Sequence, residues 1–290
     1  MKKNGKMISC SARKDWAFHI RDWLDLHRNY AKIHGDLEFD YDDIDYAFGF
    51  VEGYTDLYGG RISEKNINIT KVDLYWLYDH GIGLKIPMST KVFNDELYKE
   101  SLPFLKAYHR KGNAIITSVD KFSKRIKEDF PDYQIEASCI QDVDNLEQLE
   151  KKISLDYYDT IVLPIHMNDD IKFLKSIKKK DKKIIRLFLN VECSYTCPKK
   201  ICYGTTSKIN IFEKNSGKPR KMKCSFFDLN MKRTFYNDKI NWNQYYFDKS
   251  KFDKIGINKY KLVPPWEEQQ RTFIMYEKNY EKNKDMNGKN

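Results

Sequence analysis

The chain has 290 residues, and its 52 Lys and Arg against 42 Asp and Glu give a formal net charge of +10. This balance favours an anionic partner, a nucleic acid or an anionic small molecule, although a lysine-rich surface can also serve solubility alone. No run approaches the roughly 18 apolar residues of a membrane span, so we expect a cytoplasmic protein without a membrane partner. Six cysteines are too sparse for a disulfide framework, which leaves reduced thiols or a metal site.

Short apolar runs alternate with amphipathic segments along the chain, the pattern of repeated βα units around a parallel sheet. Eight such strands close a barrel, whereas five or six would favour an open sheet. In chain order, strands are expected at 6–10, 44–50, 83–88, 114–117, 133–137, 160–163, 184–189 and 258–263. Helices are expected at 13–30, 70–78, around 97–105, 120–130, around 146–149, 168–178 and 245–254.

We therefore predict an α/β protein, a single (β/α)8 TIM-like barrel over residues 1–276. An irregular, cysteine-rich insertion over 190–240 separates strands seven and eight, and the lysine-rich residues 277–290 are expected to be a disordered tail. Asp120 is expected to cap its helix, and the lysine run 178–183 is expected to be a solvated turn.

The strongest local signal is a group of cysteines in the insertion. Three of them have the spacing C-x3-C-x4-C, and a fourth follows later in the same segment. Clustered thiolates select iron–sulfur clusters or zinc, although this spacing is not that of a zinc ribbon or a bacterial ferredoxin. Reduced cysteines without metal stay an alternative, and Cys10 and Cys139 could be core residues or extra ligands. The proposed metal ligands are Cys193, Cys197, Cys202 and Cys224.

Residues that follow the strands of such a barrel converge on one face, where active sites lie. Arg61 follows two glycines, which would let the backbone approach a ligand while the guanidinium binds a carboxylate or phosphate. Arg61 could instead pair with Glu52, and His166 could be a base or a packed histidine. The candidate catalytic residues are Arg61, Asn190 and His166, and the candidate substrate-binding residues are Arg13, Ser89, Ser138 and Lys261.

The segment from Asn190 to Pro198 resembles the asparagine, cysteine and Cys-Pro signature of the collagenase-like peptidase family, U32. Residues 54–61 are similar to its Gly-Arg loop, and 242–262 to its last helix and strand. Several members of this family carry a 4Fe–4S cluster on four cysteines and take part in hydroxylating ubiquinone or RNA, so the resemblance implies such a cluster here. By position it covers Cys193 and Cys197, and the other two cysteines are added because they are close in the sequence.

The chain also departs from the family, with Lys200, Tyr203 and Pro264–Pro265 where relatives usually have arginine, histidine and Gly-Arg. The leading hypothesis is an iron–sulfur enzyme that modifies a nucleic-acid base or an aromatic ring. The alternatives are a peptidase or other hydrolase, although no Gly-x-Ser-x-Gly or His-Glu-x-x-His motif occurs, and a barrel that only binds a partner. A nucleic-acid partner would follow a basic track made of Arg13, Arg61, Lys199, Lys200, Lys208, Lys218, Arg220, Lys221 and Lys223.

Overall fold

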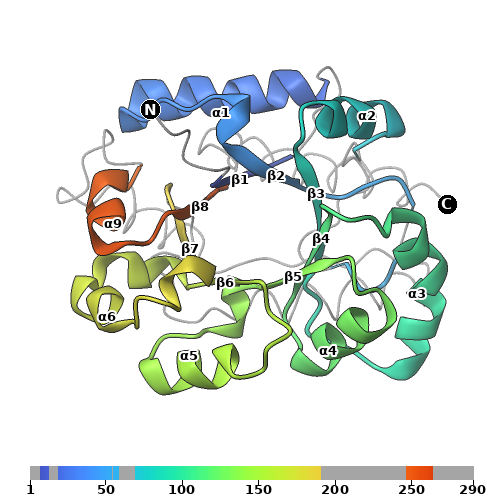
Figure 1. Ribbon diagram of the computed structural model, residues 1–290. Coiled ribbons are helices and arrows are strands. Elements are labelled where there is room, and N and C mark those ends of the chain that lie inside the picture. The colour runs from blue at the N-terminus through green and yellow to red at the C-terminus, as the bar shows by residue number, and fades with distance from the viewer. Residues whose placement is uncertain (1–6, 13–18, 54, 59–68, 191–245, 264–290) are drawn as a thin grey trace, which may run out of the picture.

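The structure, a computed structural model, describes residues 7–12, 19–53, 55–58, 69–190 and 246–263. Eight parallel strands in chain order form a closed barrel, with the helices around its outside (Figure 1). This confirms the predicted (β/α)8 fold, and pairing between the first and last strands closes the ring. The strands are β1 Ile8–Ser11, β2 Ile44–Phe48, β3 Gly83–Met88, β4 Ala114–Thr117, β5 Gln134–Ala137, β6 Thr160–Val162, β7 Ile185–Phe188 and β8 Lys259–Leu262.

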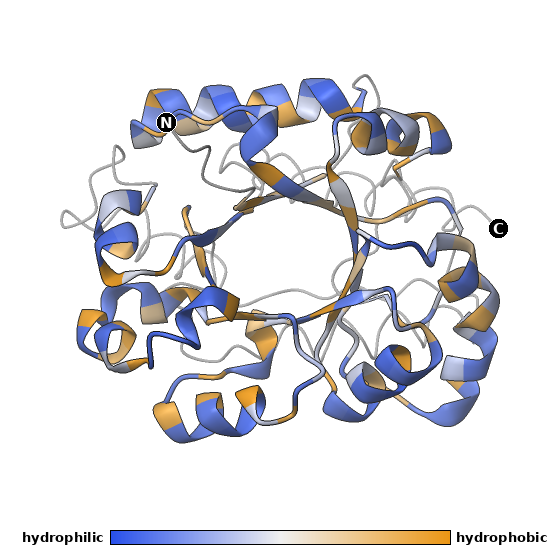
Figure 2. Cartoon of the chain, in the orientation of Figure 1, coloured by the Kyte–Doolittle hydropathy of each residue, from blue (hydrophilic) through white to orange (hydrophobic). Residues whose placement is uncertain are grey.

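The helices mix polar and apolar residues, as expected for elements that cover a barrel on one side only (Figure 2). They are α1 Ile20–Gly35, α2 Lys71–Asp79, α3 Asp95–Tyr108, α4 Asp120–Asp129, α5 Leu146–Ile153, α6 Ile171–Ser176 and α9 Lys249–Ile255. Short 3-10 turns occupy Tyr41–Asp43, Cys139–Gln141, Ile165–Asp169 and Lys182–Ile184. No helix in this described part of the chain has the length and hydropathy that crossing a bilayer requires.

The helix boundaries differ from the expected ones where capping decides them. The first helix is capped by His19, whose ring accepts the Arg21 backbone N–H, and it continues to Gly35 rather than residue 30. The helix expected to begin at residue 168 begins at Ile171, because a 3-10 turn precedes it and Asp170 caps it.

The expected capping role of Asp120 is wrong, because α4 begins at that residue and Val119 holds the cap position without a side-chain bond. Asp120 instead accepts hydrogen bonds from Lys152 Nζ and from the Tyr158 hydroxyl, each at 2.5 Å. The lysine run 178–183 is not uniformly solvated either. Lys182 is buried, and its ammonium donates to the Ile255 carbonyl at 3.0 Å, at the C-terminal end of α9.

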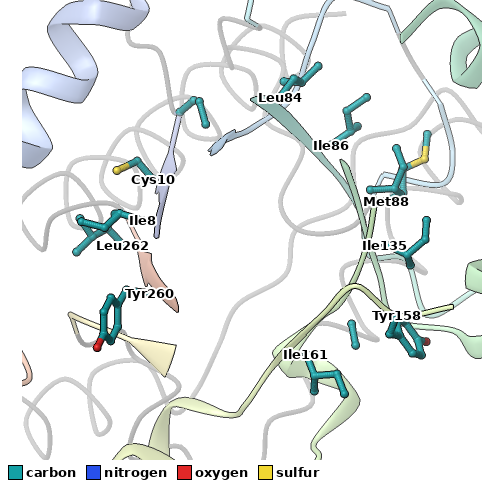
Figure 3. Close-up of a cluster of buried hydrophobic side chains, with 14 of the residues drawn as sticks. Ile8, Cys10, Leu84, Ile86, Met88, Ile135, Tyr158, Ile161, Tyr260 and Leu262 are labelled. Atoms are coloured by element: carbon teal, nitrogen blue, oxygen red, sulfur yellow. The ribbon is translucent and has the colours of Figure 1, made fainter. Parts of the chain in front are cut away.

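The main hydrophobic core lies between the barrel and the helices, not inside the barrel. Alternate strand residues point outward into it, and Figure 3 shows their side chains around the outside of the ring of strands. Cys10 is one of them and is fully buried, so the alternative that it is a core residue is the one supported. The outward set includes Ile8, Leu84, Ile86, Met88, Ile135, Ile161, Tyr260 and Leu262.

Candidate functional site at the C-terminal mouth and in the barrel interior

Polar residues follow the C-terminal ends of several neighbouring strands. Ser89 and Ser118 follow β3 and β4, and the Ser118 hydroxyl donates to the Ser89 carbonyl at 3.0 Å. Ser138 follows β5 and accepts the Ile140 backbone N–H at 3.4 Å. His166 lies partly exposed in the 3-10 turn after β6. Because parallel strands end at the same side of a barrel, these side chains share the C-terminal mouth.

Asn190, just after β7, joins the ends of the last two strands. Its side-chain amide donates to the Val263 carbonyl at 2.8 Å, and its side-chain oxygen accepts the Val263 N–H at 2.9 Å. A backbone bridge links Asn190 to Tyr246, and the Phe247 N–H donates to the Leu189 carbonyl at 2.7 Å. The chain therefore leaves the barrel at residue 190 and returns at 246 beside the same strand ends. Asn190 positions this junction, and its predicted catalytic role stays a prediction.

Several predicted site residues lie outside the described residues, so their placement adds nothing to the site. They are Arg13, Arg61, Cys193, Cys197, Cys202 and Cys224. The predicted insertion beyond Asn190 and the predicted tail over 277–290 lie there as well.

The barrel interior contains a layer of polar side chains, here called the middle layer, that no motif in the sequence indicates. The strand registers place Ser9 of β1, Lys85 of β3, Glu136 of β5 and Arg186 of β7 at one height, as alternate strands do in such barrels. Each of the four is at most 1% exposed. Branched apolar residues usually fill these interior positions in (β/α)8 barrels, so a layer made only of polar residues is unusual.

Glu136 is the centre of the middle layer because three cations reach its carboxylate. Its Oε2 lies 2.5 Å from Lys85 Nζ and 3.6 Å from Arg186 Nε. Its Oε1 accepts a hydrogen bond from Lys261 Nζ at 2.9 Å. Burial opposes ionisation of Glu136, but the charges of Lys261, Lys85 and Arg186 outweigh it and hold the pKa of this carboxyl below its usual range.

A β-bulge in β2 brings a second carboxylate to the middle layer. The register between β1 and β2 shifts by one residue after Ile8, so Asp45 is the extra residue. The Asp45 carboxylate accepts one hydrogen bond from each of the two terminal nitrogens of Arg186. This bidentate arrangement matches the planar guanidinium. Tyr46 then turns inward, with Lys85 Nζ 4.0 Å from the centre of its ring.

Lys85 differs from the other cations in its protonation. Burial and the nearby charge of Arg186 lower the pKa of Lys85 to about 7, although Glu136 and Asp45 act in the opposite direction. Arg186 stays charged at any physiological pH, because Asp45 and Glu136 outweigh its burial and raise its pKa. Lys85 is therefore the member of the middle layer that changes charge near neutral pH.

Lys261, predicted to bind substrate, lies one layer nearer the mouth than Glu136. It shares this layer with Phe48, Ile116 and Val162, and its Nζ lies 4.5 Å from the centre of the Phe48 ring. The side chain is 7% exposed, and its ammonium donates to the Glu136 carboxylate in the middle layer. This apolar layer separates the middle layer from the C-terminal mouth, so Lys261 connects the two regions.

The fold and the site together define a class of protein: a closed (β/α)8 barrel with polar groups at its C-terminal mouth and a charged layer inside. A solved structure described as that of the U32 peptidase Mk0906 is similar to this chain, with a TM-score of 0.58 and 10% sequence identity. The alignment covers 91% of this chain and 97% of that one. The fold is thus U32-peptidase-like, and at this identity the likeness extends to the fold alone. No family model matches the chain, and no curated protein does.

Proposed function

We propose that this chain is a U32-peptidase-like barrel enzyme that uses an iron–sulfur cluster to modify a nucleic-acid base or another aromatic ring. The observation that carries the proposal is the junction at Asn190 and Tyr246, where the chain leaves and re-enters at the C-terminal mouth. The segment between these residues contains four of the six cysteines. A cluster on this segment would be tethered at the face where barrel enzymes carry out their chemistry.

The donor set also favours a cluster. Four thiolates, from Cys193, Cys197, Cys202 and Cys224, suit a 4Fe–4S cluster, with zinc as the alternative occupant. Within the described ranges, no group of three or more His, Cys, Asp or Glu could hold a metal ion. Cys10 is a poor ligand because burial raises the pKa of its thiol. The proposed metal centre therefore takes its four ligands from the segment between residues 190 and 246.

When bound, the cluster would supply redox chemistry, and the chain's own residues would bind and orient the substrate. Ser89 and Ser138, which follow β3 and β5, would offer hydroxyl groups at the mouth. Arg61 would bind a carboxylate or phosphate of an anionic substrate, and His166 would hold or move a proton there.

A hydrolase is the second candidate, because the described residues include one serine–histidine pair. The Ser11 hydroxyl lies 2.7 Å from His27 Nε2. The same Nε2 is 3.0 Å from the Ser11 carbonyl, which also accepts the Trp23 indole N–H, so the pair anchors α1 to β1. His27 Nδ1 has no hydrogen-bond partner among the described residues, and burial lowers the pKa of His27 to about 4. Without an orienting carboxylate, this pair is a weak candidate for nucleophilic catalysis.

Anaerobic purification followed by iron and sulfide analysis tests the proposal. We expect bound iron with matching sulfide, and loss of both in Cys193→Ser and Cys197→Ser. Cys10→Ala is the matched control, because Cys10 is fully buried in the core outside the barrel and its substitution should leave the iron content unchanged. Zinc without sulfide would favour the alternative metal. Protein that binds no metal after anaerobic reconstitution would contradict the proposal. The remaining hypotheses would then be a hydrolase or a barrel that only binds a partner.

A nucleic-acid substrate has a separate test. Affinity for RNA or single-stranded DNA should fall steeply with salt, and neutralising Lys199, Lys200 and Arg220 should flatten that slope by roughly one unit for each lost phosphate contact. Unchanged binding in this variant, or no binding at low salt, would favour a small anionic substrate instead.

A further inference from the structure

The barrel interior contains more positive than negative charge. Lys85, Arg186 and Lys261 are all at least nine-tenths buried. In the described ranges, the acidic side chains that pair with these cations are Glu136 and Asp45. Three cations therefore share two carboxylates. A buried charge without compensation is unfavourable, so a protein has to neutralise it by losing a proton or by binding a counter-ion.

The middle layer also contains hydrogen-bonding groups without partners. Ser9 Oγ and Arg186 Nε are fully buried, and neither has a hydrogen-bond partner among the described residues. Arg186 Nε is only a donor, and the Glu136 carboxylate oxygen at 3.6 Å is beyond hydrogen-bond distance. The charge excess indicates a negative ion, and the unpartnered donors independently indicate an acceptor at the same height of the barrel.

We propose that the middle layer is a binding site for a small monovalent anion, held by Ser9 Oγ, Arg186 Nε and the ammonium groups of Lys85 and Lys261. Chloride, nitrate and formate belong to this class, because each offers acceptor atoms in all directions or in a compact plane. The proposal does not depend on the proposed function or on the cysteines.

The surroundings of the layer favour a small ion over a larger metabolite. Phe48, Ile116 and Val162 separate it from the C-terminal mouth. On the other side, the next layer contains Thr160 and Lys259, and the nearby Asp45 side chain is 13% exposed. The more polar approach is therefore from the N-terminal end of the barrel, opposite the proposed active site.

Protonation of Lys85 is coupled to this site. The charged and titratable groups that face Lys85 are Asp45 and Tyr46 from β2, Glu136 from β5, Arg186 from β7 and Lys261 from β8. Without an anion, the barrel can relieve its charge excess by releasing the Lys85 proton near pH 7. A bound anion favours the ammonium form, so binding takes up a proton. Anion affinity should therefore fall as the pH rises through about 7.

Thermal unfolding of the full chain tests the site, with sodium gluconate replaced stepwise by sodium chloride at constant ionic strength. Gluconate is a much larger anion than chloride and serves as the reference, so chloride should raise the Tm relative to gluconate, and more so at about pH 6 than at about pH 8.5. Ser9→Ala should shift the chloride midpoint upward by about tenfold, because it removes one hydrogen bond to a charged ligand. Lys85→Met should abolish the pH dependence of the chloride effect.

The matched control is Ser101→Ala, which removes a buried hydroxyl of α3 that bonds to the Leu97 carbonyl and to the Thr55 hydroxyl. It should lower the Tm equally in gluconate and in chloride. Surface lysines also attract anions, so a chloride response that is identical in the wild type and in Ser9→Ala would overturn the proposal.

A crystal grown or soaked with bromide gives a readout that does not depend on variant stability. Anomalous density within hydrogen-bond distance of Ser9 Oγ and Arg186 Nε would support the site, and bromide confined to the surface would overturn it. Formate as a second titrant distinguishes the source of the anion. A formate midpoint well below that of chloride would identify a small carboxylate as the preferred occupant, and a chloride midpoint well below that of formate would identify an inorganic ion.

Discussion

Glu136→Gln is expected to be a strongly destabilising substitution although it conserves the size of the side chain. The carboxylate is 1% exposed, and it neutralises Lys85 at 2.5 Å and Lys261 at 2.9 Å as well as the more distant Arg186. Removing one partner of a buried ion pair costs about 3–5 kcal/mol because the other charge stays buried. Against a global stability of about 5–15 kcal/mol, this loss is large. For a chain of this length it corresponds to a fall in Tm of about 5–8 °C.

Equilibrium unfolding in urea, followed by tryptophan fluorescence and circular dichroism, measures this loss. The double variant of Glu136→Gln with Lys85→Met removes both charges, so it should recover part of the loss, and the difference is their coupling energy. Glu150→Gln is the matched control. Glu150 pairs with Lys178 at 2.6 Å, but its side chain is 54% exposed, so this substitution should change the free energy of unfolding little. The reasoning is refuted if Glu136→Gln is no more damaging than this control, or if the two interior substitutions are additive.

Three further predictions concern groups outside the middle layer. Asn190→Ala leaves the Val263 N–H and carbonyl without their partners and should lower the free energy of unfolding by about 1–3 kcal/mol in the same urea assay. Lys182→Met removes the ammonium that caps α9 and should cost on the order of 1 kcal/mol, whereas Lys183→Met, at an exposed position, should be neutral. Because the folded pKa of His27, about 4, lies below its ordinary value of 6.5, the unfolded chain binds more protons between these values. Stability should therefore fall as the pH drops through this window, and His27→Gln should remove that part of the pH dependence.

The barrel could be predicted from the sequence because the outward-facing residues dominate the pattern. Each strand was located within two residues of its observed bounds, as at 83–88 and 114–117 where they coincide. Helix ends were less predictable. His19 caps a helix although histidine is not a typical capping residue. Asp120 is of a typical capping type, but its carboxylate accepts hydrogen bonds from Lys152 and Tyr158 instead.

The middle layer was missed because its members are far apart in the sequence and each is flanked by apolar residues. A charged residue such as Lys85 or Glu136 inside an apolar run was a usable signal, since a strand buried on both sides has no solvated face for it. The height at which these residues meet depends on the strand registers, and the approach of Asp45 depends on a bulge. Neither can be derived from periodicity alone. Lys261 was identified as a site residue, but its partner Glu136 was not.

The junction at Asn190 and Tyr246 also has an evolutionary consequence. Because the two ends of the intervening stretch are already held side by side by the barrel, the entropy lost on closing that stretch grows only slowly with its length. For this entropy alone, a change in the number of residues between these two positions therefore alters the stability of the barrel only slightly. A barrel that holds both ends of a connecting stretch in place can therefore accept a different stretch between them, and new chemistry can be added at the mouth while the fold is preserved.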